Sequence, residues 1–301
     1  MKEVRHLQGR LYREYAQSVG LESHAQYMHG TPLRPVVPLD TAIDGVMIVG
    51  AYPSARFATI AGDRDVPVAD NLGPFETERW FDGSRVREQP SAAELEELVL
   101  APLELPRTLC WITDLVKVFL FKPGHRKKYE RLGATVPAGY MREQFEELGE
   151  RSLPWLEEEV AVARPRLLLT LGREVAGIVR GVKGDKARNR LLGAPVEPVR
   201  FGSVEVPTAH LAHPGILMRP TGKHWKRAHL EERVPLLRRF MRAEGLGRRS
   251  ARRASPIWRT REQSHEDYVR RVCAWAPVDP TDWRFQSGNQ AFRARSQWRP
   301  P

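Results

Sequence analysis

The sequence has little cysteine and no long apolar segment. Among its 301 residues are only two cysteines, Cys110 and Cys273, which excludes a disulfide framework and a four-cysteine metal or iron–sulfur site. The longest apolar runs, VMIVG and LLLTLG, are far shorter than the about 20 residues that span a bilayer. The opening residues MKEVRHLQGR lack the apolar region of a signal peptide. We therefore expect a cytoplasmic protein that makes no contact with a membrane.

Acidic residues are in the minority. The chain has 37 Asp and Glu against 48 Lys and Arg, which gives a net charge of +11 and an isoelectric point near 10.0. Such an excess of positive charge favours a polyanionic partner, because Lys and Arg release the counterions that are condensed on phosphates. A basic protein that is merely soluble is the alternative.

The C-terminal segment, residues 246–301, carries much of this charge. It contains twelve Arg, no Lys and five acidic residues, a net charge of +7, together with four of the eight Trp. Arg interleaved with Trp suits contact with phosphates and stacking on bases, and packing of the Trp side chains on the rest of the protein is an equally compatible interpretation. We expect three regions: a helical arm with a proline-rich connector over residues 1–40, an α/β domain over 41–245, and this basic extension.

Short apolar segments alternate with amphipathic ones along the α/β domain. Strands are predicted at residues 45–50, 108–118, 165–171 and 201–207, and helices near 1–30, 92–100, 140–163, 173–179 and 223–244. Strands separated by helices predict a three-layer α/β/α fold around a central, mainly parallel four-stranded sheet. Residues 59–90 are polar and rich in glycine, and we expect a long loop of the kind that carries function. Residues 122–138 are basic, and we expect an exposed loop there.

Four segments end in small, polar or proline residues that are typical of loops at a binding site. In chain order they are VMIVGAYPSARFA (46–58), NLGPF (71–75), CWITDLVKV (110–118) and PTAHLAHPGILMRP (207–220). Because the carboxyl ends of parallel strands meet at one edge of a sheet, we expect these segments to converge there. Their order and content resemble the uracil-DNA glycosylase superfamily over residues 44–240, whereas 1–40 and 246–301 lie outside the resemblance.

The resemblance implies roles for individual residues. Phe75 matches the aromatic residue that stacks on the extruded base, and His213 matches the histidine that hydrogen-bonds the base oxygen on which charge develops. Gly215 stands where the family commonly has Ser and keeps the tight turn. The residues that follow match the loop that inserts an apolar side chain into the duplex, namely Ile216, Leu217, Met218 and Arg219.

The loop after the first strand departs from the family pattern. In several branches of the family this loop supplies an acid or amide that positions the attacking water, but here Ala51 and Tyr52 occupy those places. We therefore expect the water-positioning acid elsewhere. Asp70, directly before NLGPF, is the first candidate, and Glu76 is the second.

The residue that reads the edge of the base also differs, because Asp114 stands where the family has Asn. An ionised Asp only accepts hydrogen bonds and therefore fits the exocyclic N4 amine of cytosine. A protonated Asp in a dry pocket can donate to cytosine N3 and so improve a poor leaving group. An Asp that caps the next helix or pairs with Lys117 is the structural alternative.

The position after Pro53 decides how much room lies beside C5 of a pyrimidine. The strict uracil enzymes of the family have Tyr there, which blocks any C5 substituent, whereas this chain has Ser54 followed by Ala55. An open C5 side together with Asp114 fits a 5-substituted cytosine, such as the hydroxymethylated and glucosylated cytosines of some phage genomes. We therefore expect a monofunctional DNA glycosylase that flips out and hydrolytically excises such a base, leaves an abasic site, and serves in antiphage defence.

We expect this enzyme to act on duplex DNA as a monomer, without a metal or cofactor. The predicted catalytic residues are His213 and Asp70, and the predicted base pocket contains Gly50, Tyr52, Pro53, Ser54, Phe75 and Asp114. The predicted DNA contacts are Lys117, Lys122, Arg126, Lys127, Ile216, Leu217, Met218 and Arg219. Two alternatives stay open: a glycosylase for uracil or deaminated bases, with protonated Asp114 acting like Asn, and a DNA-binding protein that has lost catalysis.

A metal site is a further alternative, and it would draw on His210, His213, His224 and His229. No cysteine and no clear carboxylate partner accompanies these histidines in the sequence. Since metal sites built from histidine commonly include such ligands, the pattern favours histidines without a metal.

Overall fold

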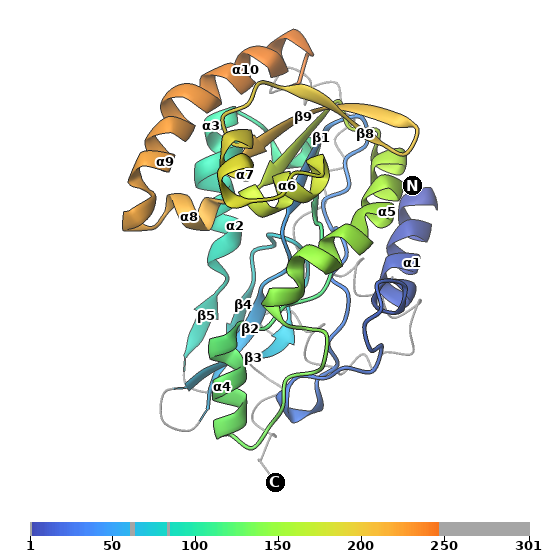
Figure 1. Cartoon of the computed structure of the whole chain (residues 1–301), viewed down its shortest axis with the longest axis vertical. Coiled ribbons are helices and arrows are strands. Elements are labelled where there is room, and N and C mark those ends of the chain that lie inside the picture. Colours follow the sequence, from blue (N-terminus) through green and yellow to red (C-terminus); the bar gives the residue numbers. More distant parts are fainter. Residues whose placement is uncertain (1, 61–63, 83–84, 247–301) are drawn as a thin grey trace.

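A five-stranded sheet lies at the centre of the molecule. The computed structural model describes residues 2–60, 64–82 and 85–246 (Figure 1). The sheet has the strand order β6-β1-β7-β9-β8, with β1 (Val46–Gly50), β6 (Cys110–Asp114), β7 (Leu167–Leu171), β8 (Glu197–Phe201) and β9 (Val204–Leu211). β1 pairs in parallel with β6 and β7, and β7 pairs in parallel with β9. The fold is therefore α/β with a mostly parallel sheet, as the sequence predicts.

The sheet has one strand more than the predicted four. β8 runs antiparallel to β9 at the edge of the sheet, from the pair Glu197↔Thr208 to the pair Phe201↔Val204. Only Val199 and Phe201 of β8 are buried, as expected for an edge strand with one solvated face. The prediction missed this strand because its polar alternation carries no continuous apolar run.

Helices cover both faces of the sheet. They are α1 (Lys2–Ser18), α2 (Pro90–Leu95), α3 (Ala101–Leu103), α4 (Pro123–Arg131), α5 (Phe145–Ala163), α6 (Arg173–Arg180), α7 (Asp185–Leu191), α8 (Pro214–Leu217), α9 (Lys223–Ala228) and α10 (Val234–Ala243). On one face, Met47 and Leu168 pack with side chains of α1, α5 and α6. On the other face, Ile48 and Leu169 pack with α2, α3 and α10. This arrangement is consistent with the predicted three-layer architecture (Figure 1).

The N-terminal helix shares a core with the sheet. Tyr15, on the apolar stripe that the sequence predicts, is fully buried, and its hydroxyl lies 2.6 Å from Ser152 Oγ on α5. At the surface, Arg10 Nη1 donates to Glu158 Oε2 at 2.6 Å. These contacts fasten α1 along α5. None of the helices in the described part of the chain has both the length and the apolar character needed to cross a membrane.

Residues 59–90, predicted as one long loop, belong largely to two antiparallel strand pairs, the first of which begins before this stretch. β2 (Ala55–Ile60) pairs with β3 (Arg64–Asp70), and β4 (Arg79–Phe81) pairs with β5 (Val86–Glu88). The loop prediction was wrong because these strands have only three to seven residues each and charged residues interrupt them, so that no long apolar periodicity marks them in the sequence.

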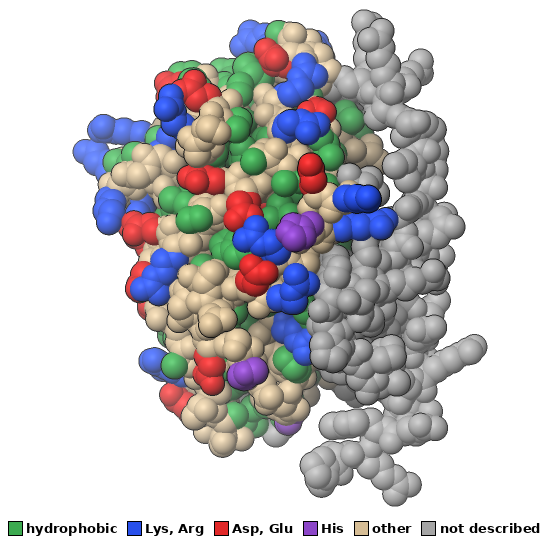
Figure 2. Space-filling model, turned by 90° about the vertical axis from the view of Figure 1, so that its right-hand side faces the viewer, with side chains coloured by type: hydrophobic (Ala, Val, Ile, Leu, Met, Phe, Trp, Pro, Cys, Tyr) green, Lys and Arg blue, Asp and Glu red, His purple; other side chains and the backbone are tan. Residues whose placement is uncertain are grey.

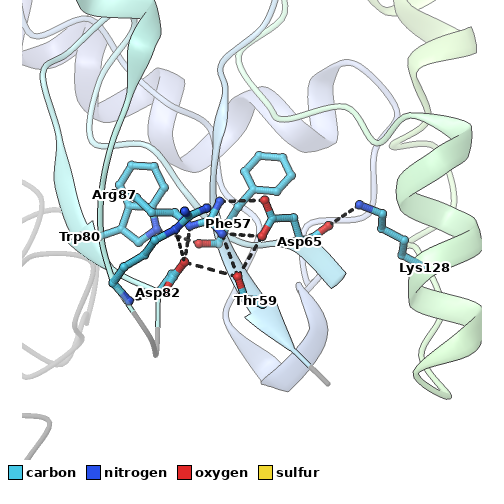
Figure 3. A network of polar contacts seen from close by, with 8 residues as sticks. Phe57, Thr59, Asp65, Trp80, Asp82, Arg87 and Lys128 are labelled. Atoms are coloured by element: carbon cyan, nitrogen blue, oxygen red, sulfur yellow. Dashed lines mark hydrogen bonds and ion pairs between the residues drawn. The ribbon is translucent and has the colours of Figure 1, made fainter. Parts of the chain in front are cut away.

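A network of polar contacts joins the two strand pairs (Figure 3). Arg87 on β5 donates from Nη1 to Asp65 Oδ2 on β3 and from Nη2 to Thr59 Oγ1 on β2, both at 2.8 Å, and it also pairs with Asp82. Lys128 Nζ on α4 donates to the carbonyl of Asp65 at 2.9 Å. One guanidinium thus holds together segments that have little apolar surface of their own.

The basic stretch at residues 122–138, also predicted as a loop, forms α4 over its first half. The buried side chain in this helix is Tyr129, whose ring lies 5.3 Å from that of Phe121, measured between centroids. This single anchor explains why the sequence shows no helical apolar stripe there. Arg126 and Lys127, predicted to contact DNA, are exposed on α4.

Candidate active site

The carboxyl ends of the parallel strands meet at one edge of the sheet. In the register of the sheet, Gly50 at the end of β1 lies opposite Asp114 at the end of β6. β7 ends beside β9, and Gly172 N donates to the carbonyl of Leu211 at 2.8 Å. The loops that follow these strands therefore begin next to one another, as the parallel arrangement predicts.

Gly50 lets a carboxyl group and an aromatic ring approach the backbone closely. A Cβ atom at this position would lie 2.1 Å from Asp114 Oδ1 and 2.6 Å from Phe75 Cε2, so no larger residue fits. The ring of Phe75 lies 6.3 Å from the imidazole of His213, measured between centroids. Asp114 and Phe75 thus meet at Gly50, and His213 lies beside the Phe75 ring, so that residues from four separate motifs are brought together.

Phe75 is held in an uncommon backbone conformation. Its φ angle is 53°, in the left-handed region that residues other than glycine seldom adopt. Arg107 Nη2 donates to the carbonyl of Phe75 at 2.9 Å, and buried Glu78 accepts a hydrogen bond from Leu72 N. Conformations of this kind cost about 1–3 kcal/mol and persist where surrounding contacts impose them, often at functional sites.

Asp114 is almost fully buried at the end of β6. Burial raises the pKa of its carboxyl to about 7; the positive charge of Lys117 opposes this rise and the negative charge of Glu159 adds to it. Near neutral pH the carboxyl is therefore divided between a protonated form, which can donate a hydrogen bond, and an ionised form, which only accepts.

Lys117, predicted to contact DNA, is fully buried behind Asp114. Its Nζ donates to Thr113 Oγ1 and to the main-chain carbonyl of Asp114, both at 2.6 Å, and it forms an ion pair with Glu159. Glu159 also accepts from Trp111 Nε1 at 2.9 Å. The prediction of a DNA contact is therefore wrong for Lys117, because a buried ammonium group cannot reach a phosphate. The group instead fixes the loop that carries Asp114.

His213 directly precedes α8 and has a defined tautomer. Gly215 N donates to Nδ1 at 3.1 Å, so the proton of the neutral ring is on Nε2. Burial lowers the pKa of His213 to about 4; the charge of Glu174 opposes this shift, and those of Arg142 and Arg219 add to it. Around neutral pH the imidazole is uncharged and carries an Nε2–H donor.

The loop after His213 exposes only part of the predicted wedge. Ile216 and Met218 are large apolar side chains that are 38% and 46% exposed. Leu217 is buried and packs with Leu98, so the prediction that it contacts DNA is wrong. In this short helical turn, the side chain between the two exposed ones points into the protein and anchors the loop.

Tyr52, Pro53 and Ser54 connect β1 to β2. Pro53 is buried and Ser54 is half-buried. The Tyr52 ring packs against Phe145, with 5.9 Å between centroids, and the guanidinium of Arg142 lies 5.0 Å from the centroid of the Tyr52 ring. The loop predicted to wrap the base thus also joins the pocket to the start of α5.

Three basic side chains from different segments act on one another electrostatically. Burial lowers the pKa of Lys122, and the positive charges of Arg142 and Arg219 add to that shift. Lys122 and Arg219 were predicted from the sequence as DNA contacts. Arg142 was not, because it lies in a polar stretch that contains no recognisable motif. On the α1 and α5 side of the molecule, by contrast, basic and acidic side chains are interspersed (Figure 2).

Asp70 lies at the end of β3, and both of its carboxylate oxygens accept hydrogen bonds from the N-terminal region. Tyr27 Oη donates to Oδ1 at 2.7 Å, and Arg34 N donates to Oδ2 at 2.9 Å. Asp70 therefore ties this region to β3, a structural role that the prediction of a water-positioning acid did not include. Glu76, the second candidate, has its Oε2 atom 3.6 Å from Arg107 Nη2.

Two carboxylates that the motifs did not identify flank His213. Glu174 Oε2 and His213 Cβ lie 3.7 and 3.6 Å from the point where a Cβ on Gly172 would stand. Glu94 Oε2 and His213 Nδ1 lie 3.4 and 3.3 Å from the equivalent point at Gly215. A sequence signal does exist for Glu174, because it is the first acidic residue after the buried strand β7.

The histidines named as metal-ligand candidates have other partners. His229 Nε2 lies 2.6 Å from the carbonyl of Leu98. His210 is fully buried, with Arg180 Nε donating to its Nε2 at 3.0 Å and Thr170 Oγ1 lying 2.8 Å from its Nδ1. Across residues 2–60, 64–82 and 85–246, no group of three or more His, Cys, Asp or Glu side chains is arranged to hold a metal ion.

We predict that His210 makes the free energy of unfolding depend on pH. Burial lowers the pKa of His210 to about 3, with the charges of Arg180 and Arg233 adding to the shift, whereas an unfolded histidine titrates near 6.5. The stabilisation is therefore complete above about pH 6.5 and falls on acidification, by about 2 kcal/mol at pH 5. Urea unfolding at pH 7 and pH 5 should show a smaller difference for His210→Gln than for the wild type; equal differences would contradict the prediction.

No protein-family model and no curated protein matches the chain. The site is therefore interpreted from its geometry. Apart from Leu246, the predicted basic extension lies outside the described residues. The meeting of Phe75 and Asp114 at Gly50, with His213 beside the Phe75 ring, is therefore the basis for assigning a function.

Proposed function

We propose that this protein is a monofunctional DNA glycosylase, a divergent member of the uracil-DNA glycosylase superfamily that excises a 5-substituted cytosine. The observation that best supports the proposal is that the Asp114 carboxyl and the Phe75 ring meet at Gly50, with the His213 imidazole beside the Phe75 ring. A base taken out of the duplex needs a stacking surface, a partner for its hydrogen-bonding edge and a donor for the charge that develops on it.

Each of these groups has a distinct part in the reaction. The base stacks on Phe75, which contributes about 1–3 kcal/mol, and the small side chain of Ser54 leaves room beside C5. Asp114 accepts from N4 when ionised or donates to N3 when protonated. As the bond between C1′ and N1 breaks, its electron pair passes to the base, and His213 Nε2–H stabilises the negative charge on O2. Water supplies the hydroxyl group that remains on C1′ of the abasic site.

The surroundings of the pocket suit a DNA strand. The positive charges of Lys122, Arg142 and Arg219 act on one another electrostatically, and such a group of charges would attract the phosphates on either side of a flipped nucleotide. The exposed Ile216 and Met218 side chains can fill the gap that the base leaves in the stack, which compensates for unstacking. DNA is therefore the proposed partner, and the hydrolysis requires no cofactor.

A second candidate function is excision of uracil or another deaminated base. It is favoured by the pKa of about 7 for Asp114, because a protonated carboxyl offers both a donor and an acceptor. Like the amide of Asn, it can then accept from N3–H and donate to O4 of uracil. The two candidates share all other pocket residues and differ in the base edge that Asp114 recognises, N3 and N4 of cytosine or N3–H and O4 of uracil.

The test is to incubate the protein with duplexes that each carry one altered base and to look for alkali-labile abasic sites. The panel contains cytosine, 5-hydroxymethylcytosine, its glucosylated form, and uracil. Release of the substituted cytosines supports the first proposal and an antiphage role, whereas release of uracil alone favours the second. Tight binding of these duplexes without any base release would identify a DNA-binding protein that has lost catalysis.

We predict that the Ile216→Ala/Met218→Ala double variant releases the base from duplex DNA about tenfold more slowly, because the gap in the stack is no longer filled. The rate on single-stranded DNA should stay near that of the wild type, since no stack has to be opened there. The matched variant Leu217→Ala should instead lower the free energy of unfolding by about 2–5 kcal/mol, as for a buried leucine. Equal losses on both forms of DNA would contradict a wedge.

A further inference from the structure

The proposed hydrolysis lacks one group, a carboxylate that orients the attacking water. The loop after β1 offers Ala51 and Tyr52 at the places where such a group is expected. Both oxygens of Asp70 accept hydrogen bonds from the N-terminal region. Glu76, the other candidate from the sequence, accepts a hydrogen bond from Thr77 N at 3.2 Å, and its Oε2 lies 3.6 Å from Arg107 Nη2. A carboxylate from another element at the carboxyl edge of the sheet is therefore the better candidate.

Glu174, in the first turn of α6, lies beside the pocket. Its Oε2 atom and His213 Cβ stand 3.7 and 3.6 Å from the same point next to Gly172. Its Oε1 atom lies 4.0 Å from Nη2 of Arg142, the arginine that covers the ring of Tyr52. Glu174 is about one-third exposed, so water has access to it.

The electrostatics of the pocket agree with this placement. Burial raises the pKa of Tyr52; Arg142 opposes this shift, and the negative charges of Glu174 and Asp114 add to it. Glu174 also opposes the lowering of the His213 pKa. A carboxylate that acts on both Tyr52 and His213 lies close to the loop and the imidazole that are proposed to hold the sugar and the base.

Glu94 is the rival carboxylate, and its position fits the role less well. It lies next to Gly215 on the Nδ1 side of the His213 ring, the nitrogen that accepts the Gly215 hydrogen bond. Burial raises the pKa of Glu94, and only the charge of Arg219 opposes this.

We propose that Glu174 is the catalytic residue that orients and deprotonates the water attacking C1′, in place of the acid that the β1 loop lacks. The inference rests on the proposed glycosylase function. In the step, the oxygen of water forms a bond to C1′ while the bond from C1′ to N1 breaks. One proton of the water passes to the Glu174 carboxylate and from there to solvent. The electron pair leaves with the base, which is stabilised by His213 and later takes a proton from solvent.

The experiment compares Glu174→Gln and Glu174→Ala with the wild type in single-turnover base release, using whichever duplex of the panel the wild type cleaves. We expect the rate to fall by about a hundredfold or more, the usual contribution of general base catalysis. The affinity for a duplex with a non-hydrolysable abasic analogue should stay within about threefold of the wild type, since the substitution acts on the transition state. Thermal unfolding of both variants checks that they are folded.

Rescue by azide distinguishes a Glu174 that acts as the general base from a Glu174 that only positions Arg142. Azide attacks carbon without losing a proton and therefore needs no general base. It should restore base release in Glu174→Ala and yield a 1′-azido sugar that mass spectrometry detects. Arg142→Gln, which removes the neighbouring guanidinium, should not be restored. Absence of rescue in Glu174→Ala would overturn the inference and leave Glu174 as a positioning residue.

Two matched variants complete the test. Asp185 is an exposed carboxylate that lies 3.0 Å from Arg173, and Arg173 also pairs with Glu174. The Asp185→Asn variant should therefore keep the wild-type rate. Glu94→Gln tests the rival: a large loss there with a normal Glu174→Gln rate overturns the inference in favour of Glu94. Normal rates in the Glu174 variants overturn the inference alone, whereas a wild type that releases no base from any duplex contradicts the proposed function itself.

Discussion

Replacing His213 by alanine is expected to slow base release by about a hundredfold or more while leaving DNA affinity nearly unchanged. The Nε2–H group of the neutral ring is available because Gly215 N occupies Nδ1. Negative charge appears on the base oxygen only as the glycosidic bond breaks, so the hydrogen bond is strongest in the transition state. Its loss should therefore appear in the rate of the chemical step and not in binding.

Single-turnover rates with enzyme in excess, followed by alkaline cleavage of the product strand, measure this effect. His224→Ala is the matched control, because His224 is exposed on α9 and has no part in the pocket. Because the pKa of His213 lies near 4, its ring stays neutral at pH 5. Protonation of His213 should therefore not lower the wild-type rate on acidification to pH 5. A His213→Ala variant that releases the base at the wild-type rate would remove His213 from the mechanism.

Replacing Asp114 by asparagine is expected to shift the preference from cytosine-type bases towards uracil by about 10- to 100-fold, which corresponds to about 1–3 kcal/mol for a mismatched hydrogen bond at a buried edge. The amide donates to O4 and accepts from N3–H of uracil. It also removes the charged acceptor for N4 and the acidic proton for N3 of cytosine.

The same substitution should change the pH dependence of the rate. With a pKa of about 7, wild-type Asp114 loses its proton as the pH rises through neutrality. If the protonated form donates to N3, release of the cytosine-type base falls about tenfold per pH unit above that value. In Asp114→Asn this decline should be absent, because the amide does not titrate.

Rates between pH 5 and pH 9 on matched cytosine-type and uracil duplexes measure both effects. Asp44→Asn serves as a control, since Asp44 is exposed and pairs with Arg164 at the surface. An Asp114→Asn variant with the base preference and pH profile of the wild type would show that this carboxyl does not contact the base. A wild-type rate that rises above pH 7 would instead assign recognition to the ionised carboxylate.

The apolar runs of the sequence were sufficient to predict the core of the fold. VMIVG and LLLTL became β1 and β7 with every residue buried, because a parallel strand covered on both faces has to be apolar throughout. From their parallel arrangement it also followed that the ends of β1, β6, β7 and β9 would meet. The proximity of Gly50, Asp114 and His213 was predictable for that reason, since each follows or ends such a strand.

Elements stabilised by polar contacts were not predictable in this way. The β2–β3 and β4–β5 pairs depend on Arg87 and its partners Asp65 and Thr59, which are far apart in the sequence and leave no periodic pattern. α4 depends on one buried residue, Tyr129. In each case the stabilising contact joins segments that only the folded chain brings together.

Only the tertiary structure decided what the individual charged residues do. Lys117 and Asp70 occupy places in the sequence that favour a role at the surface or in catalysis, yet Lys117 pairs with Glu159 in the core and Asp70 binds Tyr27. Glu174 belongs to no motif and still lies beside His213. The sequence shows which charges a chain carries, but burial and the distance to a partner decide whether a charge is structural or free to act, and both depend on the packing of distant elements.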